Sequence, residues 1–200
     1  MEDENRITEV RTCKEEEESE SLIKIAILGQ DLVGKTSLIS KFINDKLPIT
    51  RETTVEDQYK KVIKINGTEC ELKILDTAGQ EEYQSMMDDW IDFASCFILV
   101  YSIDDNDSFN QIKQKYDYII KRKSKKKKKY SIIIVGNKCD LENERKVSKE
   151  EVESYGKNIG VITMESSALN GINVNEAFLK VTEIHLDKIG NEKGKGCPCF

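Results

Sequence analysis

Hydrophobic positions along the chain change pattern at regular intervals from about residue 22 onward. Short apolar runs occupy Leu22–Leu28, Phe97–Ile103 and Ser131–Val135, and Phe97–Ile103 is of the kind that forms a strand buried on both faces of a sheet. Val161–Met164 is predicted to be the last strand. Between these runs, hydrophobic residues recur every three or four positions, as on one face of a helix. Strands that alternate with helices predict an α/β fold built on an open, mostly parallel sheet with helices on both faces.

The helical spacing also predicts where the helices begin and end. Ser148 stands three residues before Glu151, a capping box that marks a helix start, and Gly190 is a typical helix stop. A short helix is expected before Phe97. The longer predicted helices cover Lys35 to Asn44, the segment from Phe109 to Ile120, the segment after Ser148, and Val174 to Gly190.

A hairpin is predicted in the first half of the chain. Apolar residues alternate with polar ones over residues 62–65 and 70–74, on either side of Asn66-Gly67. Asn-Gly between two alternating runs is the strongest short-range hairpin signal. The hairpin supplies one antiparallel edge strand and completes an expected sheet of six strands.

Composition fits one folded domain, because 200 residues with 38% hydrophobic content suit a single domain with tails. We expect a disordered acidic tail at residues 1–20, the domain at 21–190 and a flexible tail at 191–200. The first 21 residues hold nine acids and three bases, so they account for the whole net charge of −6. Neither a membrane-length apolar run nor a signal peptide is seen, so we expect a cytosolic chain. Cys70 and Cys96 are expected to be reduced core residues.

The first apolar run leads directly into a glycine-rich loop. Gly29 to Thr36 reads G-x-x-x-x-G-K-T, and a helix is predicted to follow it. Strand, glycine loop and helix in this order predict a phosphate-binding loop, in which backbone N–H groups and Lys35 surround a polyphosphate. The residues expected to contact the nucleotide here are Gly29, Gln30, Asp31, Leu32, Val33, Gly34, Lys35, Thr36 and Ser37.

Further candidate residues follow the second hairpin strand. Asp76 is placed to hold Mg²⁺ together with the hydroxyl groups of Thr36 and Thr54. Gly79 leaves its N–H free to approach a terminal phosphate. Gln80 can donate and accept hydrogen bonds at once, which suits the orientation of an attacking water.

The apolar run Ser131–Val135 ends at a second group of polar residues, Asn137, Lys138 and Asp140. A carboxylate such as Asp140 accepts from two adjacent N–H groups, which guanine offers and adenine lacks. Adenine would leave buried polar atoms unpaired, so the pattern favours guanine. The methylene stem of Lys138 can lie along the base.

These segments stand in the order and at about the spacing of the nucleotide-binding motifs of small GTPases, which the chain resembles from Leu22 to Gly190. The segment Thr54–Lys61 resembles the effector loop of the Ras branch. The resemblance implies the small G domain form of the P-loop NTPase fold. The matching segments are Gly29–Thr36, Thr54, Asp76–Glu81, Asn137–Asp140 and Ser167–Ala168.

The resemblance implies a GTP/GDP molecular switch that binds and hydrolyses GTP with Mg²⁺. Effector proteins would bind through the loop Thr54–Tyr59, and an exchange factor and a GTPase-activating protein would regulate the switch. The residue roles implied are catalysis by Gln80, Lys35 and Thr54, magnesium binding by Thr36, Thr54 and Asp76, γ-phosphate contact by Gly79, and base contact by Asn137, Lys138, Asp140, Ser167, Ala168 and Leu169.

Four residues depart from the family pattern. Arg51 and Thr53 replace the Tyr and Pro common in Ras, so the resemblance does not identify the effector, and the other two lie at the nucleotide. Asp31 stands where Ras has glycine, and its carboxylate would crowd Gln80 and repel the γ-phosphate. One interpretation is slow hydrolysis, which in its strongest form gives a hydrolysis-deficient, mostly GTP-bound binding module; the other is that this subfamily tolerates the change. Leu169 replaces a lysine that usually lies beside the guanine, so nucleotide affinity is expected to fall while specificity is kept.

An ATP-using P-loop enzyme is disfavoured by Asn137 and Asp140.

The C-terminal residues Cys197-Pro198-Cys199-Phe200 form a prenylation box, with Cys197 as the expected lipidation site. One lipid holds weakly, so the basic run Lys121–Lys129 is a candidate second membrane contact, with a solvated insertion as the alternative. The acidic tail is expected to compete for these lysines. The run lacks interleaved aromatic residues, which disfavours nucleic acid. The expected location is the cytoplasmic face of a membrane, with the plasma membrane as first choice.

Overall fold

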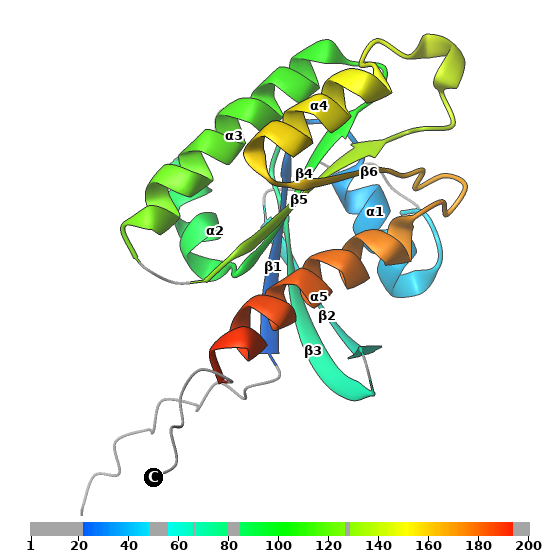
Figure 1. Cartoon of the computed structure of the whole chain (residues 1–200). Helices are drawn as coiled ribbons and strands as arrows, with labels where there is room; N and C mark the ends of the chain where they lie inside the picture. The colour runs from blue at the N-terminus through cyan, green and yellow to red at the C-terminus, as the bar shows by residue number, and fades with distance from the viewer. Residues whose placement is uncertain (1–21, 49–55, 66, 80–84, 127–128, 194–200) are drawn as a thin grey trace, which may run out of the picture.

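The computed structural model describes residues 22–48, 56–65, 67–79, 85–126 and 129–193. These residues form one α/β domain (Figure 1). Its strands are β1 Leu22–Gly29, β2 Glu56–Ile65, β3 Thr68–Thr77, β4 Cys96–Ser102, β5 Ser131–Asn137 and β6 Ile162–Glu165. Its α-helices are α1 Lys35–Asn44, α2 Met87–Phe93, α3 Asn106–Ser124, α4 Lys149–Ile159 and α5 Val174–Lys193.

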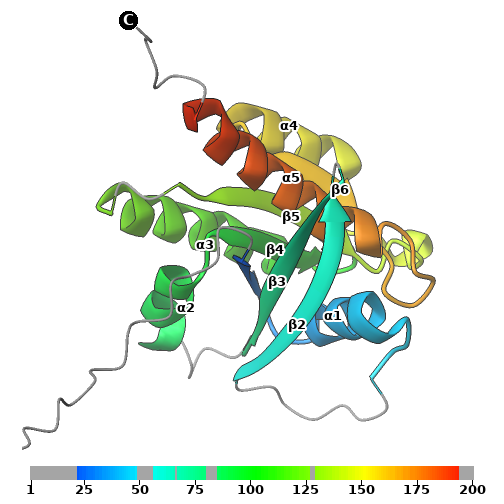
Figure 2. The ribbon, with the colours of Figure 1, turned by 90° about the horizontal axis from the view of Figure 1, so that it is seen from below.

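The strands form one six-stranded sheet in the order β2-β3-β1-β4-β5-β6. β2 pairs with β3 antiparallel, whereas the other neighbouring strands are parallel. Figure 2 shows β2 and β3 lying along each other at one edge of the sheet. The six-stranded, mostly parallel sheet with one antiparallel edge strand is therefore confirmed.

The central strand β1 is buried on both faces, so alternate side chains enter two separate cores. Ile25 and Ile27 point to the face covered by α1 and α5. Ala26 and Leu28 point to the face covered by α2, α3 and α4. Helices on both faces, as predicted, explain why β1, β4 and β5 read as continuous apolar runs, whereas the edge strand β6 is only partly buried. Cys70 and Cys96 are buried free thiols in β3 and β4, as expected.

Two details differ from the sequence expectations. The last helix does not stop at Gly190, because α5 continues to Lys193. Glycine near a helix end costs only about 1 kcal/mol, so it does not force a stop. The basic run Lys121–Lys129 is not entirely a loop, since α3 extends to Ser124. Among the described residues, no helix has the length and apolar composition needed to cross a membrane.

The topology gathers the predicted motifs at one end of the sheet. Parallel strands place their carboxyl ends at a common edge, where ligands of open α/β sheets bind. The phosphate loop follows β1, Asp76 lies at the end of β3, and Asn137 ends β5. Ser166 and Ser167 follow β6 directly. The sheet thus brings together residues that lie more than 100 positions apart, as in the hydrogen bond between Asn137 and Val33.

Candidate functional site

The phosphate loop connects β1 to α1 with its amide groups at the helix N-terminus. Gly34 has a φ of 95° as the N-cap of α1, a conformation that favours glycine. The Lys35 ammonium group folds back over the loop and donates to the Gln30 carbonyl at 2.9 Å. Burial lowers the pKa of Lys35 to about 8, against the opposing charges of Asp76 and Asp31. A buried cation beside a helix N-terminus is an anion site.

Asp76 faces this loop from the end of β3 and is fully buried. Its Oδ2 accepts from the Thr36 hydroxyl at 2.7 Å, whereas its Oδ1 has no hydrogen-bond partner among the described residues. Burial raises the pKa of Asp76 to about 6. A buried carboxylate oxygen without a partner, next to a hydroxyl, fits a hard divalent cation such as Mg²⁺. The residues present therefore suit the metal that the family implies.

Gly79 packs directly against the backbone of the phosphate loop. A Cβ atom at this position would lie 2.3 Å from the Asp31 nitrogen and 2.5 Å from its Cα, so any side chain here is excluded. The Asp31 side chain is exposed, and its Oδ1 accepts from the Leu32 N–H at 2.9 Å. The carboxylate therefore accepts the hydrogen bond of one of the loop's own amide groups.

Asn137 is almost completely buried, at 2% exposure, and bonds through both ends of its amide. Its Nδ2 donates to the Val33 carbonyl at 2.8 Å. Its Oδ1 accepts from the Ala168 N–H at 3.1 Å and from the Ser166 hydroxyl at 3.3 Å. Asn137 thus holds the phosphate loop and the segment after β6 at a fixed separation, and its direct contact with a base stays a prediction.

Asp140 and Lys138 lie beside this brace. The Ser167 hydroxyl donates to Asp140 Oδ1 and accepts from the Asn170 N–H at 3.1 Å, which fixes the carboxylate against the segment after β6. The Lys138 ammonium lies 3.7 Å from an Asp104 carboxylate oxygen. Leu169 is 62% exposed. Asp140 and Ser167 are therefore held together, whereas Lys138 pairs with Asp104, and Leu169 lies close by in the chain.

Comparison with known proteins identifies this group of loops. A model of the Ras family matches residues 24–187, most of the chain. The chain belongs to the Ras family. It is 34% identical over 187 residues to the Ras-related protein R-Ras of Homo sapiens, covering 88% of this chain and 85% of that protein. It is 39% identical over 155 residues to the Ras-like protein RAS2 of Hydra vulgaris, covering 78% and 80%.

The chain is also similar to a fungal Ras-like protein. The Ras-like protein 1 of Pyricularia oryzae is 37% identical over 179 residues, covering 82% of this chain and 74% of that protein. As a Ras-family small GTPase, the protein binds GTP and GDP, hydrolyses GTP and acts as a molecular switch. Membership of this family implies that regulators and effectors in general act with the protein.

Three of the predicted site residues of this GTPase lie outside the described residues: Thr54, Gln80 and Cys197. Their roles stay predictions. The effector segment is described from Glu56 onward, where it forms the start of β2.

Two contacts of the site do not follow from the sequence. Asp104 follows β4 and pairs with Lys138, and its position after a buried strand could have marked it as a candidate. Trp90 of α2 donates its Nε1–H to Glu56 Oε2 at 2.8 Å, which joins the effector segment to the helix after Gln80. No sequence signal connects these two residues, which lie 34 positions apart.

Proposed function

We propose that this Ras-family GTPase holds Mg²⁺ through Thr36, Thr54 and Asp76, and that Asp31 slows its GTP hydrolysis. The observation that carries the metal assignment is the buried Asp76 carboxylate, with one oxygen bonded to Thr36 and the other without a partner among the described residues. When bound, Mg²⁺ would neutralise part of the phosphate charge.

The phosphate loop supplies the binding groups for the polyphosphate. Its backbone amides and the Lys35 ammonium bind the phosphate oxygens. Lys35 then donates its hydrogen bond to the ligand instead of to the Gln30 carbonyl. Gly79 presents its N–H to the terminal phosphate, which its close packing on Asp31 supports. In this proposal Gln80 orients the attacking water and Thr54 reports the terminal phosphate to the effector segment.

The base site binds guanine through Asp140, whose carboxylate accepts from two adjacent N–H groups of the base. Ser167 holds that carboxylate in place, and the Ala168 N–H lies next to it in the chain. Lys138 lies along the base, with Asn137 bracing the loops around it. Leu169 adds apolar contact without the charge of the usual lysine.

Asp31 slows hydrolysis for two physical reasons. Its carboxylate accepts from the Leu32 N–H, so this amide reaches the phosphates only after the side chain turns away. After the side chain has turned, its negative charge is close to the γ-phosphate and to Gln80. There it repels the negative charge that develops in the transition state. If this effect is strong enough, the protein persists as a GTP-bound binding module.

The test is single-turnover GTP hydrolysis by the wild type, Asp31→Gly and the charge-free Asp31→Asn, each with and without an activating protein. We expect Asp31→Gly to be faster than wild type by at least ~10-fold, and Asn to fall between them because it keeps the bulk. Equal rates for all three proteins would contradict the role of Asp31. Faster nucleotide release after chelation of Mg²⁺ tests the metal site separately.

We further propose a lipid anchor at Cys197 that places the protein on the cytoplasmic face of a membrane. Among membranes, we propose the plasma membrane. Exposed Lys121 and Lys125 support a second contact with anionic lipid. Arg122, Lys123 and Lys126 contribute less, because Arg122 and Lys126 pair with carboxylates of α2 and Lys123 is buried. Mass spectrometry of the C-terminal peptide from eukaryotic cells tests the anchor; an unmodified Cys197 would contradict it.

A further inference from the structure

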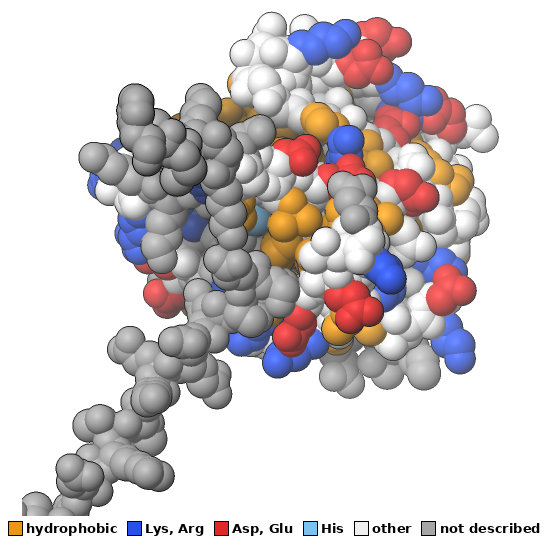
Figure 3. All heavy atoms as spheres, turned by 60° about the horizontal axis from the view of Figure 1, so that its bottom comes forward, with side chains coloured by type: hydrophobic (Ala, Val, Ile, Leu, Met, Phe, Trp, Pro, Cys, Tyr) orange, Lys and Arg blue, Asp and Glu red, His pale blue; other side chains and the backbone are white. Residues whose placement is uncertain are grey.

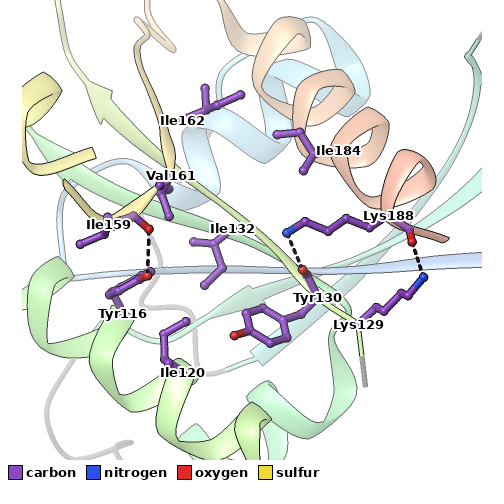
Figure 4. A pocket seen from close by; sticks show the side chains of 11 residues that line it. Tyr116, Ile120, Lys129, Tyr130, Ile132, Ile159, Val161, Ile162, Ile184 and Lys188 are labelled. Atoms are coloured by element: carbon purple, nitrogen blue, oxygen red, sulfur yellow. Dashed lines mark hydrogen bonds between the residues drawn. The ribbon is translucent and has the colours of Figure 1, made fainter. Parts of the chain in front are cut away.

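A cavity of about 750 Å³ lies at the edge of the sheet opposite the nucleotide loops. It is open to solvent and is lined by the second half of α3, the start of β5, the connection from α4 to β6, and α5 (Figure 4). Its walls are mainly apolar, and its floor includes the buried Ile132. The side chains that form the apolar walls are Tyr116, Ile120, Ile132, Ile159, Val161 and Ile184.

The rim of this cavity is positively charged. Lys188 donates to the Tyr130 carbonyl at 3.0 Å, and Lys129 donates to the Lys188 carbonyl, which fixes both ammonium groups beside the opening. Lys125, the C-cap residue of α3, is exposed, whereas Lys126 pairs with Asp92. Burial, together with the charges of Lys188, Lys123 and Lys129, lowers the pKa of the adjacent His185 to about 4. The local potential is therefore positive, although the whole chain carries −6.

The N-terminal segment enters the fold close to this cavity. In the parallel register Ile25 stands opposite Cys96, and Cys96 opposite Ser131. Two strand spacings, about 10 Å, therefore separate β1 from β5. Leu22 lies toward the same end of the sheet as Tyr130, where Figure 3 shows apolar side chains exposed on the surface.

We propose that the acidic segment before β1 binds in this cavity, with Ile7 and Val10 against its apolar walls and Glu15–Glu18 on the lysines between it and β1. The order of the sequence fits the path, because the acidic run Glu15–Glu18 lies nearer to β1, and Ile7 and Val10 lie farther from it. The eleven residues from Arg11 to Ser21 reach about 36 Å when extended, which exceeds the distance required.

Charge distinguishes this occupant from the C-terminal segment, which leaves α5 at the same edge. Residues 191–200 carry one acid, Glu192, and two lysines, Lys193 and Lys195. Their side chains are net positive and would be repelled by the rim, whereas residues 1–21 carry nine acids and three bases. The N-terminal segment therefore matches the cavity in both charge and apolar content.

Hydrogen exchange measured by mass spectrometry on the full chain tests the proposal. Peptides covering residues 116–132 and 184–189 should exchange several-fold more slowly in the full chain than after deletion of residues 1–20. The double variant Ile7→Ser/Val10→Ser and the double variant Lys129→Glu/Lys188→Glu should each exchange like the deletion. Lys180→Glu, a single charge reversal on the exposed side of α5, should keep the protection. High salt should reduce the protection of the wild type.

Three results would overturn the proposal. The first is equal exchange of these peptides in the full chain and in the deletion. The second is protection that disappears on removal of residues 194–200 instead, which would make the C-terminal segment the occupant. The third is protection that rises with protein concentration, which would make the occupant a second copy. Bound guanine nucleotide, measured in the same samples, reports separately on the G domain.

Discussion

At the scale of single residues, the site depends on polar side chains that the fold buries. The sequence places Asp76 and Asn137 at strand ends, and this was sufficient to predict their neighbourhood. It could not predict that Asn137 bonds to Val33 and Ala168 at once, because this requires the spacing of three loops. It also could not predict the environment of Asp76, since a pKa depends on burial and not on residue type alone.

Asp76 gives a prediction about pH. Its pKa in the folded protein, about 6, lies above the unfolded value of 3.8, so the folded state binds more protons between these limits and loses stability as pH rises through them. Without nucleotide and Mg²⁺, Asp76→Asn should therefore unfold at a higher temperature than wild type at pH 7.5. The gain in unfolding free energy is up to about 3 kcal/mol.

This gain should shrink at pH 5, where the wild-type carboxyl is protonated. Thermal melts of both proteins in chelator at the two pH values measure it, and Asp76→Asn should also lose the Mg²⁺ dependence of nucleotide release. A variant that is less stable than wild type at pH 7.5 would show that Asp76 is not an unfavourable buried charge in the ligand-free protein.

Variants of Asn137 and Asp140 distinguish a role in holding the loops together from a role in base recognition. Asn137→Asp replaces the N–H group that donates to the Val33 carbonyl with a carboxylate oxygen in a buried position, so the unfolding free energy should fall by about 2–4 kcal/mol. Asp140→Asn, the matched control, still accepts from Ser167 and should change stability little while it weakens the preference for guanine. Denaturant unfolding and nucleotide competition measure the two effects. Equal stability of both variants would contradict the brace.

At the scale of elements, ion pairs across two helices decide how the basic run behaves. Arg122 of α3 contacts Asp88 at 2.8 Å and Asp92 at 2.6 Å on α2, and Lys126 contacts Asp92 at 2.6 Å. A run of lysines in the sequence suggests a solvated loop, because sequence alone does not show that α2 presents carboxylates to α3. The strands and helices themselves were predictable from their periodicity, as the two faces of β1 illustrate.

The helix pair α2–α3 gives a second pH prediction. Hydrogen bonds from Arg122 and Lys126 hold the pKa of Asp92 well below its usual range, so this contact stabilises the fold above pH 4 and is lost as pH falls further. Asp92→Asn should lower the unfolding free energy at pH 7 by up to about 1 kcal/mol, since the pair is partly exposed. Urea unfolding at pH 7 and pH 3 checks this. A difference that grows at pH 3 would have the wrong sign.

At the scale of the whole molecule, the two ends of the sheet carry different chemistry. The nucleotide loops lie at one end of the sheet. The cavity with its lysines, the start of β1 and the end of α5 lie at the other. Sequence analysis could place the charges at one edge through strand direction. It could not predict the cavity, because its walls come from α3, α5 and the turn before β6.

The acidic tail should limit contact with membranes at this edge. Deletion of residues 1–20 should strengthen binding of the non-lipidated protein to vesicles that contain anionic lipid, and added salt should reverse the gain. Vesicle sedimentation measures this, with neutral vesicles as the lipid control. Adding Lys121→Glu and Lys125→Glu to the deletion should abolish the gain. Unchanged binding after deletion would exclude competition by the tail.

The central claim is that the loops at the carboxyl end of the sheet bind a guanine nucleotide. Its most direct test is the nucleotide content of the purified protein, released by denaturation and identified by chromatography. We predict about one guanine nucleotide per chain, as GTP or GDP, without adenine nucleotide, and failure of excess ATP to replace it. A protein that carries no guanine nucleotide, or exchanges it for ATP as readily as for GTP, would contradict the account.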